Sequence, residues 1–459
     1  GERGVKNQVV DALNRPKGVF MEGKYDTLAV SGEGLISTID RELQVLAEKL
    51  MKGKMGSVVA IEPSTGEILT FVSAPSYDPN MMVGRERGNN YMKLLNDETR
   101  PMFIRPIQAS YPPGSVFKVV AALTAQQDGL IDQHTAFFCP GGYRYGGGRA
   151  IMRGTHVHGS TDLIRSIQGS CNTYYGYTYA RMIDSRGMSG PRAYDLWRAG
   201  LLKFGLGTKL GIDLPGEKPG LVPTSDFYTK RYGSDKWRSG FNISLSIGQG
   251  ELGITPLQMA NIMAIVANRG FYYRPHLVKG IGEKKIIKEE FIEKISAGVD
   301  AKYYEPVIEG MSRVVNMPGG TAYSVRIPGI EMCGKTGTAQ NPHGENHAVF
   351  FAFAPRENPK IAIAVFVENA GYGGTWAGPI ANMLVEKYIN DTISLPKYIQ
   401  DRIYNANFIP KPTKKETITK DTTTQKKAPS KRALQTSQTL PPQKKEYYVH
   451  HSQLTNRHE

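Results

Sequence analysis

Residues 110–123, SYPPGSVFKVVAAL, place a hydroxyl and an amine where they could act together. The Pro-Pro-Gly break should start a new element, and the apolar run after it predicts a helix. Ser115 would then lie at the helix N-terminus, with Lys118 one turn later on the same face. Helix-start N–H groups favour developing negative charge, and a buried amine with a lowered pKa can accept the hydroxyl proton. The segment predicts a nucleophilic serine with a lysine base, although a capping serine and a solvated lysine would leave the same short pattern.

Residues 169–175, GSCNTYY, contain a second pair of polar side chains. Ser170 and Asn172 are two positions apart, a spacing that lets both project into a cleft from a loop or a helical turn. There a hydroxyl can relay a proton, and an amide can both donate and accept hydrogen bonds. The alternative is a serine that only caps a helical turn.

Residues 334–340, GKTGTAQ, carry a third polar group and read as part of a strand. Alternation along that strand puts Lys335 and Gly337 on one face, and a glycine there lets another element approach the backbone closely. Lys335 would supply a positive charge, and the Thr336 and Thr338 hydroxyls suit a carboxylate. The alternative is a glycine-kinked strand with a solvated lysine.

Each motif alone could arise by chance, but the three occur here in a fixed order. Ser-x-x-Lys, Ser-x-Asn and Lys-Thr-Gly are together the set found in penicillin-binding proteins and class A β-lactamases. The middle motif departs from the usual Ser-Asp-Asn only at Cys171. Over roughly residues 30–395, segments such as VVAIEPSTGEILTFVSAPSYDPN, GIDLPGE and SIGQGELGITPLQMA resemble class B penicillin-binding proteins. The stretch HGSTDLIRSIQGSCNTYY is most similar to elongation-type members, although division-type members share the three motifs.

This resemblance implies a DD-transpeptidase of bacterial cell-wall synthesis that works through a serine acyl-enzyme. Ser115 would be the nucleophile and Lys118 its base, and Ser170 would pass the proton to the leaving group. Lys335 would tune the pKa of Ser170, and Asn172 would hold the substrate amide and Lys118. The same chemistry would let β-lactam antibiotics acylate Ser115.

The resemblance also assigns the Lys-Thr-Gly strand, with Gly337 in it, to substrate binding. Lys335, Thr336 and Thr338 would bind the terminal carboxylate of a stem peptide that ends in D-Ala-D-Ala. The backbone N–H groups of Ser115 and Thr338 would form the oxyanion hole. No cofactor is required for this chemistry.

A class A β-lactamase is the nearest alternative, and it would need a glutamate after the middle motif to activate the deacylating water. No glutamate follows Asn172 until Glu217, which favours slow deacylation and hence a transpeptidase. A β-lactam sensor with the same fold is a second alternative, whereas three complete motifs argue against a non-catalytic scaffold.

Cysteines and histidines around the middle motif suggest a structural zinc ion as well. Cys139, His158 and Cys171, with His156 as fourth ligand, would make a tetrahedral set of two thiolates and two imidazoles. Asp132 is an alternative fourth ligand. The resemblance points the same way, because elongation-type transpeptidases with a metal beside the middle motif place a ligand near His158. The alternatives are a packed Cys171 thiol and a Cys139–Cys171 disulfide.

The three motifs need a scaffold to position them. The apolar runs of the sequence predict one sheet, built from an early and a late segment of the chain. Residues 56–75 read as a hairpin around EPSTGE, and residues 331–370 contain three strand-like runs. One sheet is expected because each piece alone would leave an apolar face in water. Helices are expected from Thr38 through DRELQVLAEKLMKG and over WAGPIANMLVEKYI, and residues 105–330 should be mostly helices and loops.

The predicted fold class is therefore α/β (α+β). By resemblance it is the penicillin-binding/β-lactamase-like serine transpeptidase fold, a central antiparallel sheet flanked by helices with a mostly helical subdomain. The expected domains are a remnant or linker of an N-terminal pedestal module (1–37), the transpeptidase domain (38–400) and a basic, disordered tail (401–459). Residues 411–459 hold 11 Lys/Arg against 4 Asp/Glu.

The net charge of +15 suits an anionic lipid or polymer, and without a groove-reading motif no nucleic-acid partner is expected. No run of about 18 apolar residues occurs, so no membrane span is expected within this chain. The resemblance implies a place on the periplasmic face of the bacterial inner membrane, anchored by an N-terminal segment absent from this chain. The implied partners are stem peptides, β-lactams, a membrane glycosyltransferase and other proteins of the elongation complex that maintains rod shape.

Overall fold

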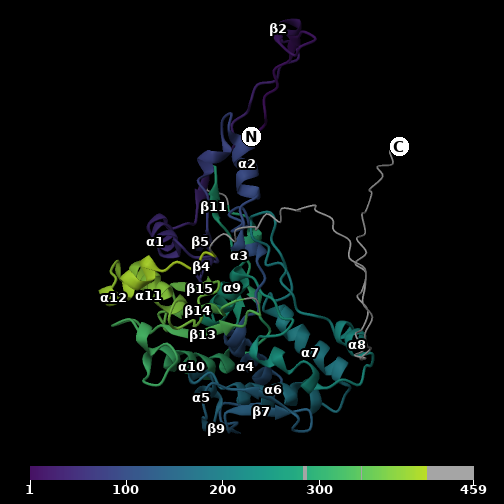
Figure 1. Cartoon of the computed structure of the whole chain (residues 1–459), viewed down its shortest axis with the longest axis vertical. Coiled ribbons are helices and arrows are strands. Elements are labelled where there is room, and N and C mark those ends of the chain that lie inside the picture. Colours follow the sequence, from purple (N-terminus) through teal and green to yellow (C-terminus); the bar gives the residue numbers. More distant parts are fainter. Residues whose placement is uncertain (283–286, 343, 411–459) are drawn as a thin grey trace, which may run out of the picture. The chain divides into compact units, whose positions relative to one another are not determined.

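The computed structural model describes residues 1–282, 287–342 and 344–410. Its centre is a five-stranded antiparallel sheet with the strand order β13-β14-β15-β4-β5 (Figure 1). The strands are β4 (Gly56–Ile61), β5 (Ile68–Ala74), β13 (Cys333–Ala339), β14 (His347–Ala354) and β15 (Ile361–Val367). The prediction of one sheet from an early hairpin and three late strands is confirmed.

Burial explains why these segments form the sheet. The strands β14 and β15, HAVFFAFA and IAIAVFV, are buried at every position except the partly exposed His347. Such continuous apolar runs are typical of strands that are covered on both faces. The helices α1 (Arg41–Met51) and α11 (Ala377–Asn390) lie on one side of the sheet, and α9 (Pro256–Ala267) lies on the other (Figure 1).

Local capping sets where the covering helices begin. The carboxylate of Asp40 accepts a hydrogen bond from the Leu43 N–H at 2.9 Å, and α1 follows directly. The helix α9 begins with a capping box between Thr255 and Gln258. The helices α1 and α11 were expected from the sequence and are confirmed, and α9 lies in the segment that was expected to be mostly helices and loops.

The segment between β5 and β13 is mostly helical, as expected, and it also contains short paired strands. Besides α9, its helices are α2 (Arg87–Leu95), α3 (Arg105–Gln108), α4 (Lys118–Gln127), α5 (Leu163–Gln168), α6 (Asn172–Asp184), α7 (Gly190–Lys203), α8 (Ser225–Tyr232) and α10 (Tyr304–Asn316). The strand pairs are β6 (Phe137–Cys139) with β9 (Gly159–Thr161), β7 (Gly142–Tyr145) with β8 (Ala150–Arg153), and β10 (Phe271–Tyr272) with β12 (Ile295–Ser296). These strands are too short to show a period in the sequence.

The first 37 residues form small strand pairs rather than a long element. The strand β1 (Gln8–Val10) pairs with β2 (Pro16–Val19), and β3 (Leu35–Ser37) pairs with β11 (Val278–Ile281). The second pair joins the end of this segment to the rest of the chain. Among the described residues, no helix combines the length and the apolar character that crossing a bilayer requires.

The predicted boundary at residue 400 falls inside a helix, α12 (Lys397–Asn405). The side chain of Ile403 is fully buried, and the Lys54 amine donates to the Ile403 carbonyl at 2.7 Å. Farther on, Phe408 packs edge-on against Trp376 with a centroid distance of 4.8 Å. Residues 401–410 are thus part of the folded body, and the rest of the predicted tail lies outside the described residues.

Candidate active site

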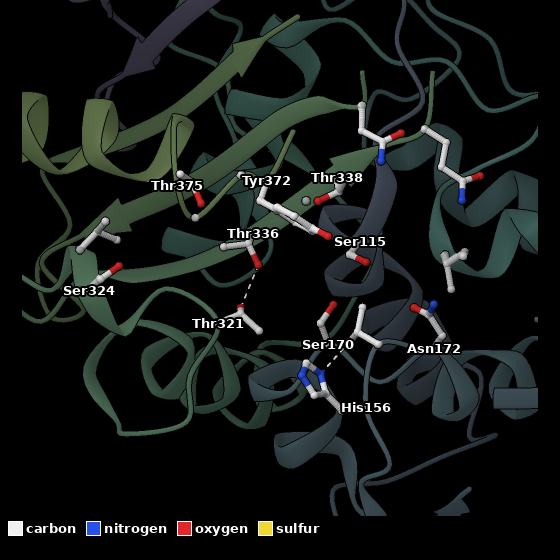
Figure 2. A pocket seen from close by; sticks show the side chains of 18 of the residues that line it. Ser115, His156, Ser170, Asn172, Thr321, Ser324, Thr336, Thr338, Tyr372 and Thr375 are labelled. Atoms are coloured by element: carbon white, nitrogen blue, oxygen red, sulfur yellow. Dashed lines mark hydrogen bonds between the residues drawn. The ribbon is translucent and has the colours of Figure 1, made fainter. Parts of the chain in front are cut away.

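A cavity of about 770 Å³ lies beside β13, the edge strand of the central sheet. Residues of all three sequence motifs line it: Ser115, Ser170, Asn172, Thr336, Gly337 and Thr338. Figure 2 shows the side chains of Ser115, Ser170 and Asn172 on one side and those of Thr336 and Thr338 on the strand opposite. Three segments that are far apart in the sequence therefore meet at one site.

Ser115 lies in a 3-10 turn, η3 (Gly114–Phe117), that leads directly into α4. The Gly114 N–H donates to the Gly248 carbonyl at 2.8 Å, and Gly114 has a φ of 60°. A Cβ at this position would lie 2.8 Å from the Thr338 carbonyl oxygen. Only glycine suits both the conformation and this contact, and it lets the turn that carries Ser115 pack directly on β13.

Lys118 is completely buried beneath the cavity. Its amine donates to the Asn172 Oδ1 at 2.6 Å, to the Ser170 carbonyl at 2.7 Å and to the Ser170 Oγ at 3.2 Å. Burial lowers the pKa of Lys118 to about 7. A large fraction of this amine is therefore neutral at neutral pH and able to accept a proton.

Lys335 is also completely buried. Its pKa lies well below the usual value because of burial and the nearby charge of Lys118. The alternation expected along β13 is present, since Lys335 and Gly337 are buried while Thr336 and Thr338 are partly exposed. The threonines thus reach the cavity surface, and the Lys335 amine lies behind them with a hydrogen bond to the Thr336 carbonyl at 3.1 Å.

Ser170 and Asn172 flank the start of α6. Ser170 has a φ of 56°, in the left-handed region that non-glycine residues rarely adopt. The Asn172 Nδ2 donates to the Arg153 carbonyl at 2.8 Å while its Oδ1 faces Lys118. Both ends of the amide have a partner, which fixes its orientation toward the cavity.

Two residues that the motifs do not include complete the β13 wall. The Thr321 hydroxyl lies 2.8 Å from the Thr336 hydroxyl, a hydrogen bond drawn as a dashed line in Figure 2. The Gln249 amide donates to the Thr338 carbonyl at 3.1 Å. Gln249 belongs to the SIGQGELG segment, whose sequence gave a resemblance but no role. Thr321 had no recognisable signal.

A buried ion pair supports the segment before the nucleophile turn. The Glu368 carboxylate accepts hydrogen bonds from the Arg105 Nε at 3.1 Å and from the Tyr111 hydroxyl at 2.6 Å. The Tyr111 ring stacks on Phe366 of β15 with a centroid distance of 3.8 Å. These contacts tie the chain just before Ser115 to the central sheet.

No aspartate or glutamate of the described chain lines the cavity. Glu217, the first glutamate after the middle motif, is buried elsewhere and accepts backbone hydrogen bonds from Leu210 at 2.6 Å and Gly211 at 3.0 Å. Its carboxylate therefore supports a loop. Among the residues that the structure describes, none offers this cavity a carboxylate that could activate water.

Three of the four expected metal ligands come together beside this site. The ligand atoms of Cys139, His158 and Cys171 lie within 4.8 Å of one another, and Cys139 Sγ is 3.5 Å from His158 Nδ1. Burial opposes ionisation of Cys139, but hydrogen bonds with Thr173 and His158 outweigh it and lower its pKa to about 6. Burial raises the pKa of Cys171 to about 11. Two sulfurs and one imidazole fit the donor chemistry of zinc.

The expected fourth ligand, His156, does not join this group. Its Nδ1 lies 3.0 Å from the Thr155 hydroxyl, and its ring lines the cavity (Figure 2). The alternative ligand Asp132 instead accepts hydrogen bonds from the Thr135 N–H at 2.7 Å and the His134 N–H at 3.0 Å. All three cysteines of the chain are free and buried.

A sheet-edge cavity lined by Ser115, with a buried lysine of lowered pKa that contacts the lining residues Ser170 and Asn172, is the arrangement expected of serine acyltransferases and hydrolases that use lysine as base. Residues 56–386 match the family model described as the penicillin-binding protein transpeptidase domain. The chain therefore belongs to the penicillin-binding protein transpeptidase family.

Relatives within this family agree with that assignment. The peptidoglycan D,D-transpeptidase MrdA of Acinetobacter baumannii is 34% identical over 365 residues, which are 75% of this chain and 52% of the relative. The chain thus spans about half the length of that curated relative.

Solved structures support the same fold. Pseudomonas aeruginosa PBP2, in complex with WCK 5153, is 32% identical with a TM-score of 0.71, covering 80% of this chain and 79% of that one. Helicobacter pylori PBP2, in complex with MreC, is 29% identical with a TM-score of 0.68, covering 84% of this chain and 69% of that one. The fold class and the resemblance to class B penicillin-binding proteins of the PBP2 type are confirmed.

Proposed function

We propose that this chain is the catalytic part of a peptidoglycan D,D-transpeptidase that cross-links stem peptides ending in D-Ala-D-Ala. The observation that carries the proposal is the buried Lys118, whose amine contacts Ser170 and Asn172 directly beneath the cavity that Ser115 lines. The names of the relatives support the same reaction.

In the first half-reaction, the neutral Lys118 amine accepts the hydroxyl proton of Ser115, and the Ser115 oxygen attacks the carbonyl carbon of the penultimate D-alanine. Thr336 and Thr338 bind the terminal carboxylate, with the Lys335 amine behind them. N–H groups of Ser115 and Thr338 bind the developing oxyanion, and such a donor typically contributes ~2.7–4 kcal/mol. The C–N bond then breaks.

The leaving D-alanine nitrogen takes a proton through the Ser170 hydroxyl, which lies 3.2 Å from the Lys118 amine. An amine of a neighbouring stem peptide next attacks the acyl-enzyme ester, and the Ser115 oxygen leaves with a proton from Lys118. A β-lactam undergoes only the first half-reaction. Its ring nitrogen stays attached to the acyl group and does not leave the site as D-alanine does.

The cavity favours a transpeptidase over the alternatives. A β-lactamase needs a group that activates water, and no described carboxylate lines the cavity. A β-lactam sensor would be acylated equally well, but it would transfer no acyl group to an amine. We place the chain in cell elongation and rod-shape maintenance because its relatives carry the MrdA and PBP2 names, with a division-type role as the alternative.

The proposal extends to a structural zinc ion held by Cys139, His158 and Cys171. Cys171 lies between Ser170 and Asn172, so a metal bound there would stabilise the turn that carries both. Metal analysis of protein purified without chelators should find about one zinc per chain. A zinc content near zero, with no loss of stability in Cys139→Ser, would contradict this part.

The cellular setting is proposed as the periplasmic face of the bacterial inner membrane, with a membrane glycosyltransferase and elongation-complex proteins as partners. The Helicobacter pylori relative was solved in complex with MreC, which supports an assembly of this kind.

The experiment that tests the reaction follows a stem pentapeptide donor and an amine acceptor by mass spectrometry. Wild-type protein should release D-alanine and form the cross-linked product, and Ser115→Ala should do neither. Release of D-alanine without product when acceptor is in excess would favour a carboxypeptidase or hydrolase, and activity in Ser115→Ala would refute the nucleophile.

A further inference from the structure

The cavity does not end at the threonines of β13. In Figure 2, Ser324 and Thr375 lie beyond Thr336 on the side away from Asn172, and Thr321 lies beside Thr336. All three hydroxyl side chains line the same cavity as Ser115. The site therefore has an extension past the position where a substrate carboxylate would meet Thr336.

Arg402, from α12, lines this extension. Its Nη2 donates to the Thr375 carbonyl at 3.1 Å, and its guanidinium carbon lies 5.3 Å from the centroid of the Trp376 ring. No other hydrogen bond and no ion pair engages this guanidinium among residues 1–282, 287–342 and 344–410. The side chain is thus held in place while most of its N–H groups stay available to a ligand.

The charge of the cavity favours an anion. The two arginines Arg153 and Arg402 line it, and no described acidic residue faces it. A guanidinium next to hydroxyl donors is suited to a carboxylate, which can accept several charge-assisted hydrogen bonds.

We propose that Arg402, with Thr321, Ser324 and Thr375, forms a subsite for a carboxylate of the amine acceptor. The inference rests on the proposed transpeptidase reaction and adds the acceptor's chemical class, an amine-bearing peptide with a free carboxylate. The attacking amine must replace the leaving amine at the same carbonyl, so it approaches from the side where the terminal D-alanine was held. That side is the extension beyond Thr336.

The transfer step itself is the reverse of acylation. The acceptor nitrogen bonds to the acyl carbon, the bond from this carbon to Ser115 Oγ breaks, and the ammonium proton passes through Ser170 to Lys118 and on to Oγ. Arg402 takes no part in these bonds. It binds and orients the acceptor.

Sequence motifs could not show this subsite, because Arg402 lies beyond residue 386, where the family match ends. It reaches the cavity only because α12 folds back onto the main body, where Lys54 binds the helix end through the Ile403 carbonyl.

The test compares Arg402→Gln with Arg326→Gln in the whole chain. Arg326 is a matched control, since its Nη1 donates to the Tyr323 carbonyl at 3.1 Å and its guanidinium carbon lies 4.2 Å from the Tyr323 ring centroid, yet it does not line the cavity. A peptide thioester serves as donor. The acceptor is a stem-type peptide with a side-chain amine, prepared with a C-terminal carboxylate and as the C-terminal amide.

For wild-type protein, the half-saturating concentration of the carboxylate peptide in the transfer reaction should be lower than that of the amide peptide. Arg402→Gln should raise the half-saturating concentration of the carboxylate peptide about tenfold, the usual effect of losing one charged hydrogen bond. It should change the half-saturating concentration of the amide peptide and the rate of penicillin acylation less than twofold. Arg326→Gln should resemble wild type in all three measurements.

Three results would overturn the subsite. In the first, wild-type protein uses both acceptors equally, and in the second, both arginine variants behave alike. In the third, Arg402→Gln slows acylation as much as transfer, which would mean that Arg402 binds the carboxylate of the donor. Failure of wild-type protein to be acylated at all would instead reject the transpeptidase reaction. Thermal melting of both variants separates a lost contact from a damaged fold.

Discussion

The two walls of the cavity hold their reactive groups by different means. Thr336 and Thr338 lie on β13, a strand hydrogen-bonded along its whole length to β14 in the central sheet. Ser170 and Asn172 lie at a turn with a left-handed backbone, outside that sheet. The turn is held instead by the Lys118 amine and lies against the cluster of Cys139, His158 and Cys171.

This difference shows which parts of the site depend on single buried groups. A strand in a sheet shares its support among many backbone hydrogen bonds, so the loss of one side-chain contact should cost little. The strained turn has fewer supports: backbone hydrogen bonds from the Ser170 and Cys171 N–H groups, the Lys118 amine, and the bond from Asn172 to the Arg153 carbonyl. The loss of one of them should therefore cost more there. We call the side of the cavity with Thr336 and Thr338 the strand wall, and the side with Ser170 and Asn172 the helical wall. We expect substitutions behind the helical wall to slow acylation more than substitutions behind the strand wall.

The largest effect is expected for Lys118→Met, which removes both the base and the main support of the Ser170 turn. Penicillin acylation should fall by ~10²–10⁴-fold, the usual contribution of a general base. Stopped-flow labelling with a fluorescent penicillin measures the rate. Lys54→Met is the control, because Lys54 is an equally buried lysine outside the cavity. Equal rates in Lys118→Met and wild type would remove the lysine from the mechanism.

The pH dependence of acylation should follow Lys118. Its pKa is lowered to about 7, so the neutral, proton-accepting fraction rises with pH and is nearly complete above pH 8. Acylation should therefore slow about tenfold per pH unit below pH 7, or about 100-fold at pH 5. A rate that stays flat from pH 5 to 8, with the protein still folded by circular dichroism, would contradict the assignment.

A smaller effect is expected for Cys139→Ser, which changes the helical wall from behind. Loss of a metal ligand should lower zinc content and slow acylation ~10-fold by loosening Ser170 and Asn172. Cys333→Ser is the matched control, since Cys333 is a buried thiol at the start of β13. Equal zinc content and equal rates in the two variants would show that the cluster does not support the turn.

The smallest effect is expected on the strand wall. Gln249→Met removes the hydrogen bond to the Thr338 carbonyl, worth ~0.5–1.5 kcal/mol, so acylation should fall only a few-fold. The same stopped-flow assay measures it. A loss larger than that of Cys139→Ser would reverse the proposed order of the two walls.

The sequence predicted the parts of this site that local pattern encodes. The hairpin and the late strands show apolar runs, and Lys335 to Thr338 follow from strand alternation. Lys118 stood out because it interrupts an apolar helix. Each of these signals lies within a few neighbouring residues.

The remaining parts arise from contacts between distant segments. Arg402 and Thr321 reach the cavity only through the packing of α12 and of the loop after α10, and Glu368 meets Tyr111 across 257 positions. The ring of His156, the predicted fourth metal ligand, lines the cavity and does not join the group of Cys139, His158 and Cys171. Spacing alone does not determine side-chain direction in such a loop.

The most direct test of the central claim is mass spectrometry of the intact protein, and of its peptides, after brief exposure to penicillin. The account predicts one adduct per chain, on the peptide that contains Ser115, with most of it still present after many minutes. An adduct on another residue would contradict the assignment of Ser115. Loss of the adduct within seconds would show rapid hydrolysis and contradict the transpeptidase.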